Sequence, residues 1–305
     1  MDFRDIEYFA VLAEHGHVGR AAEALGLSQP ALSLSLRRLE KSVDAKLVKR
    51  TPKGVELTEV GTALLSRIVR LRLARDDVVR EVADLSQGRA GDLRIGAHPG
   101  VIEDLLGPTC STLIKDTPRV TLTVSVETFD VAVSALRAGK LDLILGLAPA
   151  PPHEDLVYEH LLDDIVVVFG SVNHRLARQK QVTMAELSLE GWVVAGYGAR
   201  GSGWPQVHRA FEESGLPAPR IAVKTTSLAL RDYLVASTDL LGASSRRVLR
   251  QVTPQLRLKE LPVKEFSGTR RMGVAYRKDT YLSPAARRFI AILKATAKKL
   301  ADATR

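Results

Sequence analysis

The apolar positions near the start of the chain recur with the spacing of short amphipathic helices. In the first segment they share one helical face, which holds Phe3, Ile6, Phe9, Ala10 and Ala13. An alanine-rich segment over residues 18–25 predicts a second, closely packed helix, and Gly26 marks the turn after it. The next segment has a buried stripe at i, i+4 and i+7, formed by Leu32, Leu36 and Leu39. Because Ser28 is a good N-cap and Pro30 suits a first turn, we predict a third helix there.

The outer face of this third helix is small and polar at its start and basic at its end. Its members are Pro30, Ser33, Leu34, Arg37 and Lys41, with Arg38 at the edge. A helix, a short turn with glycine and a helix with such a face are typical of a helix-turn-helix. On this segment alone, a solvated surface helix explains the pattern equally well.

The stretch KLVKRTPKGVELT predicts two short strands around the turn Pro52-Lys53-Gly54. This β-wing would carry Lys49, Arg50 and Lys53 at its tip. Residues 28–54 hold seven basic and two acidic residues, whereas residues 1–90 as a whole hold 15 basic and 13 acidic residues. The local concentration of positive charge favours contact with a phosphate backbone.

A long helix is predicted from the N-cap Thr58 to about residue 87. Along one side of this helix, which we call its seam, two positions recur every seven residues. Leu64, Leu71, Val78 and Leu85 occupy the first position, and Gly61, Ile68, Arg75 and Val82 occupy the second. Apolar or small residues at all seam positions but one, beside densely charged outer positions, predict a coiled-coil partner helix. Arg75 is the exception and would fix the register at some cost in stability. The alternative is a helix that packs on its own domain.

After a hinge at residues 87–92, predicted strands alternate with helices. The strands are DLRIGAH, RVTLTVSVE, LDLILGL, residues 163–169, GWVVAG and IAVKTT, and TDLLGASS follows a later helix. The helices cover residues 102–115, 129–139, 227–237 and 283–304. This alternation predicts an α/β fold with parallel sheets.

Composition narrows the class of protein. The chain has 305 residues, 45% of them apolar and 26% charged, which is ordinary for a globular protein of two or three domains. It contains no apolar run long enough to span a membrane and no signal peptide, so we expect a cytoplasmic protein without a membrane partner. The single cysteine, Cys110, excludes an internal disulfide and a multi-cysteine zinc site, and we interpret it as a small buried hydrophobe.

Catalytic and metal-binding motifs are missing from the sequence. The seven histidines lack metal-ligand spacing, and there is no nucleophile elbow or paired-carboxylate motif, so we predict no enzyme, no metal and no cofactor. The stretch GYGARG, residues 196–201, fits the dinucleotide fingerprint G-x-G-x-x-G. However, Ser202-Gly203-Trp204-Pro205 follows it instead of an opening helix, and residues 220–230 hold no carboxylate. The dinucleotide interpretation is therefore disfavoured.

The first sixty residues closely resemble the N-terminal domain of LysR-type transcriptional regulators, through the pattern AAEAL…SQPALS…LRRLE…L…R…GVELTEVG. The stretches GDLRIGAHPG, LRAGKLDLILGL and SVNHRLA resemble, more weakly, the effector domain of that family, which has a periplasmic-binding-protein fold. The resemblance thus extends over the whole chain, and it is strongest in the first fifth.

The resemblance implies an α/β protein with a winged, all-α N-terminal domain. Residues 1–58 would form the winged helix-turn-helix and residues 59–88 the linker helix for dimerisation. Effector subdomain I would comprise residues 91–163 and 266–305, and subdomain II residues 164–265, with crossings near Asp163 and Phe266. The family usually forms homotetramers on an interrupted inverted repeat in double-stranded DNA, and RNA polymerase is a further expected partner.

The resemblance also implies roles for individual residues. Ser28, Gln29, Pro30 and Ser33 match the start of the recognition helix, and Arg37, Arg38, Arg50 and Thr51 match positions near the phosphates and the wing. Lys53 is expected to contact DNA from its place at the wing tip. Many relatives have Arg or Lys where this chain has Leu34, and a leucine there either contacts a thymine methyl or is simply tolerated. His17 stands where the family often has a Ser or Thr cap. Its imidazole would cap the helix only weakly, and no role is assigned to it.

Ligands of such folds sit at loops beyond strand ends, between the subdomains. The residues expected there are His98, Pro99, Gly100, Val101, Thr128, Phe129, Gly146, Ala148, Gly198, Arg200, Ser202, Thr225 and Ser227. Backbone N–H groups at a helix start, with the Thr225 and Ser227 hydroxyls, could hold a carboxylate, and Arg200 could add a charge-assisted bond. Residues 91–305 hold 29 basic and 22 acidic residues, which favours an anionic effector such as an organic or sugar acid. For each of these residues, plain loop chemistry is the alternative.

Together these patterns predict a sequence-specific transcriptional regulator whose DNA contacts respond to a small molecule between the effector subdomains. One alternative is a protein that binds DNA without sequence preference. The other is a cleft enzyme or solute-binding protein with an added helical domain. Measurable turnover would favour the enzyme, and an export signal would favour the solute-binding protein.

Overall fold

The computed structural model describes residues 2–52, 54–87, 91–148, 152–196, 203–264, 266 and 268–303. The chain divides into two compact units, residues 1–82 and 83–305. Each unit has its own hydrophobic cores.

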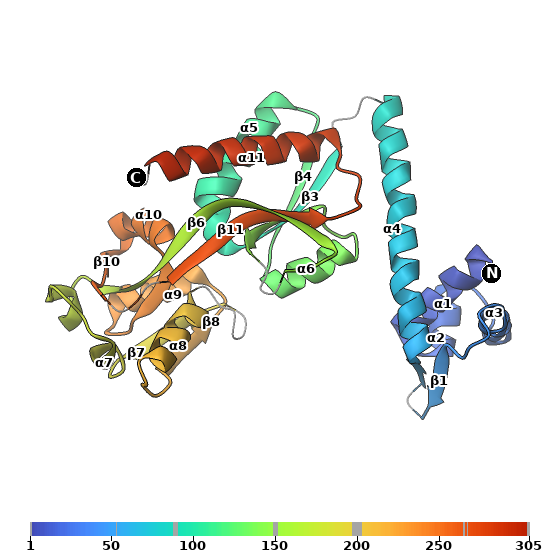
Figure 1. The fold of residues 1–305 in the computed structure, drawn as a ribbon, viewed down its shortest axis with the longest axis horizontal. Coiled ribbons are helices and arrows are strands. Elements are labelled where there is room, and N and C mark those ends of the chain that lie inside the picture. The colour runs from blue at the N-terminus through green and yellow to red at the C-terminus, as the bar shows by residue number, and fades with distance from the viewer. Residues whose placement is uncertain are drawn as a thin grey trace. The chain divides into compact units, whose positions relative to one another are not determined.

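The first unit is built from three short helices, a two-stranded wing and a long helix (Figure 1). Its elements are α1 (Phe3–His15), α2 (Val18–Ala24), α3 (Gln29–Ser42), β1 (Val48–Thr51), β2 (Gly54–Leu57) and α4 (Glu59–Gln87). The predicted caps are confirmed, because Ser28 Oγ accepts from the Ala31 N–H at 3.3 Å and Thr58 Oγ1 accepts from the Gly61 N–H at 2.9 Å. The three helices, the wing and the long helix therefore form where the sequence predicts them.

His17, expected to be at most a weak cap, has a structural role at the start of α2. Its Nδ1 accepts a hydrogen bond from the Gly19 N–H at 3.1 Å and so caps α2. The imidazole thus takes the place of a shorter hydroxyl cap at this helix start.

The seam of α4 is used in two different ways. Near its start the seam packs on the unit's own core, where Ile68 is buried and a Cβ on Gly61 would lie 2.0 Å from the Leu47 carbonyl oxygen. Further along, the seam is exposed in the chain, with Leu71 at 46%, Val78 at 59% and Leu85 at 79%. The alternative prediction, a helix that packs on its own domain, therefore holds for the first turns only. The rest of the seam forms an exposed apolar stripe.

The second unit contains β3 and all later strands and helices. Its strands are β3 (Asp92–Ala97), β4 (Thr121–Val126), β5 (Leu143–Leu147), β6 (Leu156–Ser171), β7 (Gly191–Ala195), β8 (Arg220–Thr225), β9 (Gly242–Ser245), β10 (Leu258–Glu260) and β11 (Gly268–Arg277). Its helices are α5 (Gly107–Asp116), α6 (Phe129–Arg137), α7 (Met184–Leu187), α8 (Trp204–Glu213), α9 (Leu228–Ser237), α10 (Arg246–Leu256) and α11 (Pro284–Ala303). Short 3₁₀ turns lie at Pro99–Val101 and Arg175–Arg178, and a π-helical turn lies at Ile102–Leu106.

The strands do not form parallel sheets throughout, so that prediction is wrong in part. β3 is parallel to β4 and β5, and β7 is parallel to β8. In the larger sheet, of order β10-β6-β11-β5-β3-β4 with β9 beside β6, the pairs that involve β6 and β11 are antiparallel. The reason is that two long strands, side by side in Figure 1, connect the halves of the unit in place of a strand–helix–strand crossover.

The strand predicted over residues 163–169 is longer than expected. β6 begins at Leu156 because its first half pairs with β11 from Gly273 to Arg277. Polar side chains such as Glu159 obscure the apolar pattern there, yet the Tyr276 hydroxyl satisfies Glu159 by donating to its Oε1 at 2.8 Å. The crossing residues expected for the subdomains lie within β6 (Asp163) and just before β11 (Phe266), and the subdomain boundaries themselves stay predictions.

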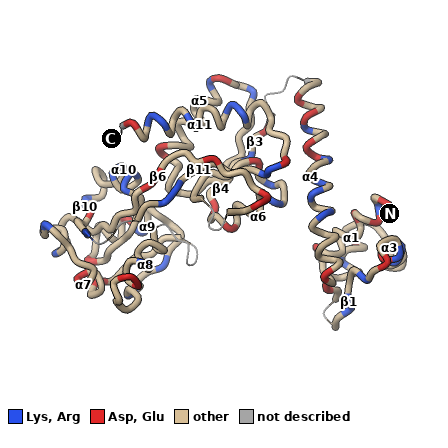
Figure 2. Tube along the Cα trace, viewed as in Figure 1, with Lys and Arg blue, Asp and Glu red and all other residues tan. Residues whose placement is uncertain are grey.

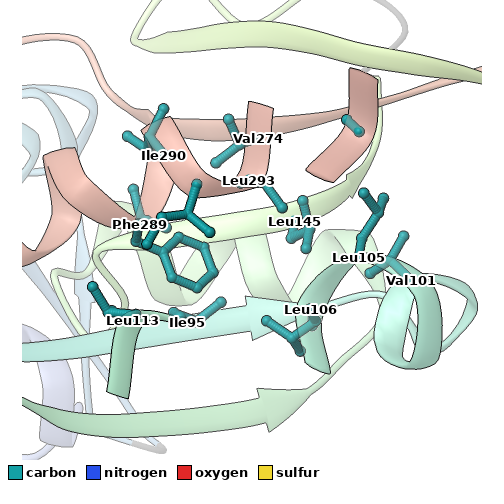
Figure 3. Packing of buried hydrophobic residues seen from close by; sticks show 14 of the residues in the cluster. Ile95, Val101, Leu105, Leu106, Leu113, Leu145, Val274, Phe289, Ile290 and Leu293 are labelled. Atoms are coloured by element: carbon teal, nitrogen blue, oxygen red, sulfur yellow. The ribbon is translucent and has the colours of Figure 1, made fainter. Parts of the chain in front are cut away.

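Each half of this unit has its own hydrophobic core. In the first half, α11 packs across the sheet, with Phe289 and Leu293 against Ile95 and Leu145 (Figure 3). In the second half, Trp192 packs edge-on against Trp204 and Phe211. Complete burial of one such side chain contributes about 1.5–3 kcal/mol, so two independent cores allow two separately ordered halves.

Cys110 is half-buried against the α11 core, and burial raises the pKa of its thiol, as expected for a packing residue. Among the residues that the structure describes, none of the helices is long and apolar enough to cross a membrane.

Candidate DNA-binding surface and effector site

The outward face of α3 is open to solvent for most of its length. Gln29, Pro30, Arg37 and Lys41 are exposed, Ser33 is half-buried, and Leu34 is 55% exposed. The opposite face is buried in the cores of the first unit through Leu32 and Leu39. Figure 2 shows basic residues on this helix, and the helix therefore presents a small, partly apolar first turn and a positive end.

Arg38 has a partner that the sequence analysis missed. Its Nη2 and Nε donate to the two Asp5 carboxylate oxygens at 2.7 and 3.2 Å, and the Ser35 hydroxyl donates to Asp5 Oδ1 at 2.5 Å. The Asp5 side chain is 5% exposed, and the hydrogen bond from Arg38 holds the pKa of this carboxyl below its usual value. A carboxylate at position 5, thirty-three residues from Arg38, gave no local signal in the sequence.

The wing is fixed to the helical domain by a glycine. The Val55 N–H donates to the Gly16 carbonyl oxygen at 2.8 Å, and a Cβ on Gly54 would lie 2.2 Å from that same oxygen. Gly54 also has φ of 135°, a conformation that side chains disfavour. Arg50 is exposed on the wing and Thr51 is half-buried, whereas Lys53 lies outside the described residues.

Three residues of the predicted effector site lie together around one hollow of the second unit. His98, Phe129 and Gly146 line it, together with Tyr158 and Gly273 from the two long strands. His98 follows β3 and its Nδ1 accepts from the Gly100 N–H at 3.0 Å, so the neutral ring carries its proton on Nε2. Burial, with a smaller effect of the Arg270 charge, lowers the pKa of His98 to about 4.

The other predicted effector residues lie on four separate loops. Pro99, Gly100 and Val101 form the 3₁₀ turn after His98, and Thr128 precedes α6 without a side-chain capping bond. Ala148 follows β5, and its N–H donates to the Arg271 carbonyl oxygen. Thr225 ends β8, while Ser227 caps α9 by accepting from the Leu230 N–H at 3.2 Å. Gly198, Arg200 and Ser202 lie outside the described residues.

A buried ionic cluster near the strand crossings was not predicted. Asp164 on β6 is fully buried, accepts from Arg270 Nε at 2.7 Å and from Arg247 Nε at 3.3 Å, and also accepts from the Ser245 hydroxyl at 2.6 Å. Arg247 donates in turn to Asp104 of the π-helical turn. Charged residues inside strands look like solvent-facing positions in a sequence, so only their packing reveals the cluster.

The described residues contain no group of His, Cys, Asp or Glu side chains that could hold a metal ion. A helix-turn-helix with an exposed basic helix, followed by a two-part α/β unit with a lined hollow, defines a DNA-binding regulator with a ligand-binding domain.

Comparison with known proteins gives the same class. Residues 3–62 match the model of the bacterial regulatory helix-turn-helix proteins of the lysR family, and residues 86–298 match that of the LysR substrate binding domain. The chain belongs to the LysR family of transcriptional regulators. It is thus a DNA-binding transcriptional regulator with an effector-binding domain, as the sequence predicted.

Individual relatives cover nearly the whole chain. The transcriptional regulator GbpR of Azospirillum brasilense is 28% identical over 97% of this chain and 86% of its own length. The SDS degradation transcriptional activation protein of a Pseudomonas species is 31% identical over 93% of each chain. The crystal structure of CbnR in complex with its target DNA has a TM-score of 0.63 at 21% identity, over 97% of this chain and 100% of that one.

Proposed function

We propose that α3 is the recognition helix and enters the major groove, while the wing contacts the adjacent backbone. The observation that carries this proposal is the exposed face of α3, whose first turn is small enough for close approach. Ser28, Gln29, Pro30, Ser33 and Leu34 would lie at the bases, and Arg37, Arg50, Thr51 and Lys53 at the phosphates. Arg38 would act differently from the other arginines, because its bond to Asp5 holds α3 on α1.

The effector would bind between the two halves of the second unit. His98, Phe129 and Gly146, which line a hollow of the first half, would contact it from that side. The proposed contacts also include Pro99, Gly100, Val101, Thr128, Ala148, Gly198, Arg200, Ser202, Thr225 and Ser227. Binding that prefers one arrangement of the halves would shift the protein toward the conformation with the matching DNA contacts.

The exposed stripe of α4 supports a homodimer. Leu71, Val78 and Leu85 would pack against the same residues of a second copy, and two such dimers would form a homotetramer on an interrupted inverted repeat. RNA polymerase is the proposed partner at the promoter, and the cytoplasm is the proposed location.

The first test is a gel shift with the full-length protein at moderate salt. DNA upstream of the protein's own gene is compared with random DNA of equal length, in excess competitor. Preferential retardation of the upstream fragment supports a site-specific regulator of that promoter. Equal retardation favours DNA binding without sequence preference, and no retardation of either fragment would contradict the proposed surface.

A further inference from the structure

Within the buried ionic cluster, one ion pair joins the two halves of the second unit. Asp104 lies in the π-helical turn of the first half, where its neighbour Leu105 belongs to the α11 core. Arg247 lies in the first turn of α10, where Leu249 belongs to a core of the second half. Arg247 Nη1 donates to Asp104 Oδ2, and the two side chains are only 13% and 7% exposed. The pair is therefore a buried bond from one half to the other.

This pair makes one of the two hydrogen bonds that its chemistry allows. Arg247 Nη2 and Asp104 Oδ1 are both buried and have no hydrogen-bond partner among the described residues. One atom is a donor and the other is an acceptor. A guanidinium and a carboxylate pair through two parallel bonds when they are aligned, and a buried polar group left without a partner is costly. Burial raises the pKa of Asp104 although the charge of Arg247 opposes it, so the single bond compensates the buried carboxylate incompletely.

The other charges of the cluster are already matched within the chain. Asp164 accepts from Arg270 Nε at 2.7 Å and from Arg247 Nε at 3.3 Å, so two arginines face two aspartates. Arg270 Nη2 is a further unpaired donor, but it lies toward the loop of Gly100, 3.8 Å from the place of a Cβ on that glycine. The partner that the cluster offers to Arg247 Nη2 is therefore Asp104 Oδ1.

The two members of the pair are held with different firmness. The Ser245 hydroxyl donates to Asp164 at 2.6 Å and accepts from the Val248 N–H, which fixes the start of α10 on β6. Asp104 lies in a π-helical turn, closed by the bond from the Gly107 N–H to the Ile102 carbonyl oxygen, and such turns are less regular than an α-helix. A small turn of the first half about β6 and β11 would move Asp104 past a fixed Arg247.

We propose that Arg247 and Asp104 form a latch with two positions between the halves of the second unit. In the arrangement of this structure the latch makes one bond, and in a second arrangement, turned about β6 and β11, it makes both. Because the π-helical turn directly follows residues 98–101, an effector at that loop would shift the balance between the two positions. This inference rests on the proposed function of the same unit and adds to it the residues that set the angle between the halves.

The test measures distances between the halves in the full-length protein without effector, by pulsed electron paramagnetic resonance. Nitroxide labels are attached after Ala291→Cys on α11 and Glu213→Cys on α8, two exposed sites in different halves, in a Cys110→Ser background. An excess of unlabelled protein restricts the measured distances to those within one chain. With both latch residues intact, the distance distribution should contain two populations.

Two variants remove the second bond by different means. Arg247→Lys keeps the charge and one bond, but an ammonium cannot make two parallel bonds, so the doubly bonded population should fall at least about tenfold relative to the other. Asp104→Asn replaces one acceptor oxygen by an amide N–H₂ and should deplete the same population. Arg250→Lys is the matched control, because Arg250 is an exposed residue of the same helix, and it should leave the distribution unchanged. Near-UV circular dichroism of the two tryptophans verifies that each labelled protein is folded.

A change in the distances that both variants share and that the control lacks supports the latch. The same distribution in the intact protein and in both variants would overturn it, and so would a change in only one of the two. Gel shifts with these proteins keep the two proposals apart. If the upstream DNA is retarded while the distances do not respond, the latch is wrong and the proposed DNA-binding function stands.

Discussion

Arg38 on α3 and Asp5 on α1 hold the proposed recognition helix to the first helix, with 2.7 Å between Nη2 and Oδ1. Replacing Asp5 by Asn removes the charge from this pair and should destabilise the DNA-binding domain by about 1–3 kcal/mol at neutral pH. The hydrogen bond from Arg38 lowers the pKa of Asp5 in the folded state, and burial opposes it. The stabilisation is therefore complete above the ordinary pKa of 3.8 and is lost as the pH falls through the lower folded value.

Urea unfolding followed by far-UV circular dichroism, repeated between pH 7 and pH 3, measures this effect. The difference in midpoint between wild type and Asp5→Asn should shrink as the pH falls below the ordinary aspartate pKa. A difference that stays constant with pH would show that Asp5 contributes by packing alone.

Arg37 is exposed beside Arg38, and we predict a purely electrostatic role for it at a phosphate. Arg37→Ala should weaken binding to all DNA sequences and reduce the slope of log affinity against log salt concentration by about one. Lys115→Ala, at an exposed site on α5, is the control and should change neither quantity. An unchanged salt slope in Arg37→Ala would contradict the phosphate contact.

Leu34 has most of its side chain in solvent at the centre of the proposed contact face. If it packs on a thymine methyl, then replacing the contacted thymine by deoxyuridine in the operator should cost about 1 kcal/mol, or roughly fivefold in affinity. The same DNA change should cost nothing for Leu34→Ala, because the variant makes no such contact. Equal losses in both proteins would mean that another residue reads the methyl.

The exposed stripe of α4 predicts that dimer formation depends on Leu71. Leu71→Asp should raise the dimer dissociation constant at least about tenfold, because each dimer would bury two unpaired carboxylates. Ser66→Asp places the same charge on the opposite, exposed side of α4 and serves as the control. Analytical ultracentrifugation measures both, and a dimer unaffected by Leu71→Asp would move the interface elsewhere.

His98 predicts a pH dependence of the effector unit. Its pKa is lowered to about 4 by burial and by Arg270, and only partly raised by Asp164. Between this value and the ordinary 6.5, the unfolded chain binds a proton that the folded protein does not. The free energy of unfolding should therefore fall as the pH decreases through this range, by up to about 3 kcal/mol.

His98→Asn keeps an acceptor for the Gly100 N–H and should lack this part of the pH dependence. Urea unfolding followed by tryptophan fluorescence at pH 7 and pH 5 compares the two proteins. Identical pH profiles would show that His98 does not retain its low pKa in solution.

The DNA-binding half was predictable because its signals are local. The Ser28 cap, the leucine stripe of α3 and the glycine turn of the wing each lie within a few residues of the element that they specify. The pairing of Arg38 with Asp5 was missed, since an ion pair between two helices has no local pattern.

In the effector unit, the sequence predicted a role for the loop of His98 and none for Arg270, which lies 172 positions later in the chain. The first half of β6 and the whole of β11 were also missed, because they carry charged residues that are satisfied only across the sheet. Three of the expected ligand contacts share one hollow, whereas the cluster of Arg270, Arg247 and Asp164 emerged only from the packing of β6, β11 and α10.

The pairing of β6 with β11 determines how the two halves of the effector unit can move. Residues 163–165 of β6 and 269–271 of β11 pair with each other, while β9 joins only from Val166 and β5 only from Met272 among the strands described. The halves are thus joined by these two strands and by the bond from Arg247 to Asp104. A two-stranded ribbon changes its twist readily but resists bending that would stretch its hydrogen bonds. The two halves can therefore turn relative to each other about this ribbon, and Asp164 and Arg270 lie at its middle. A change in the twist of the ribbon would rotate one half against the other.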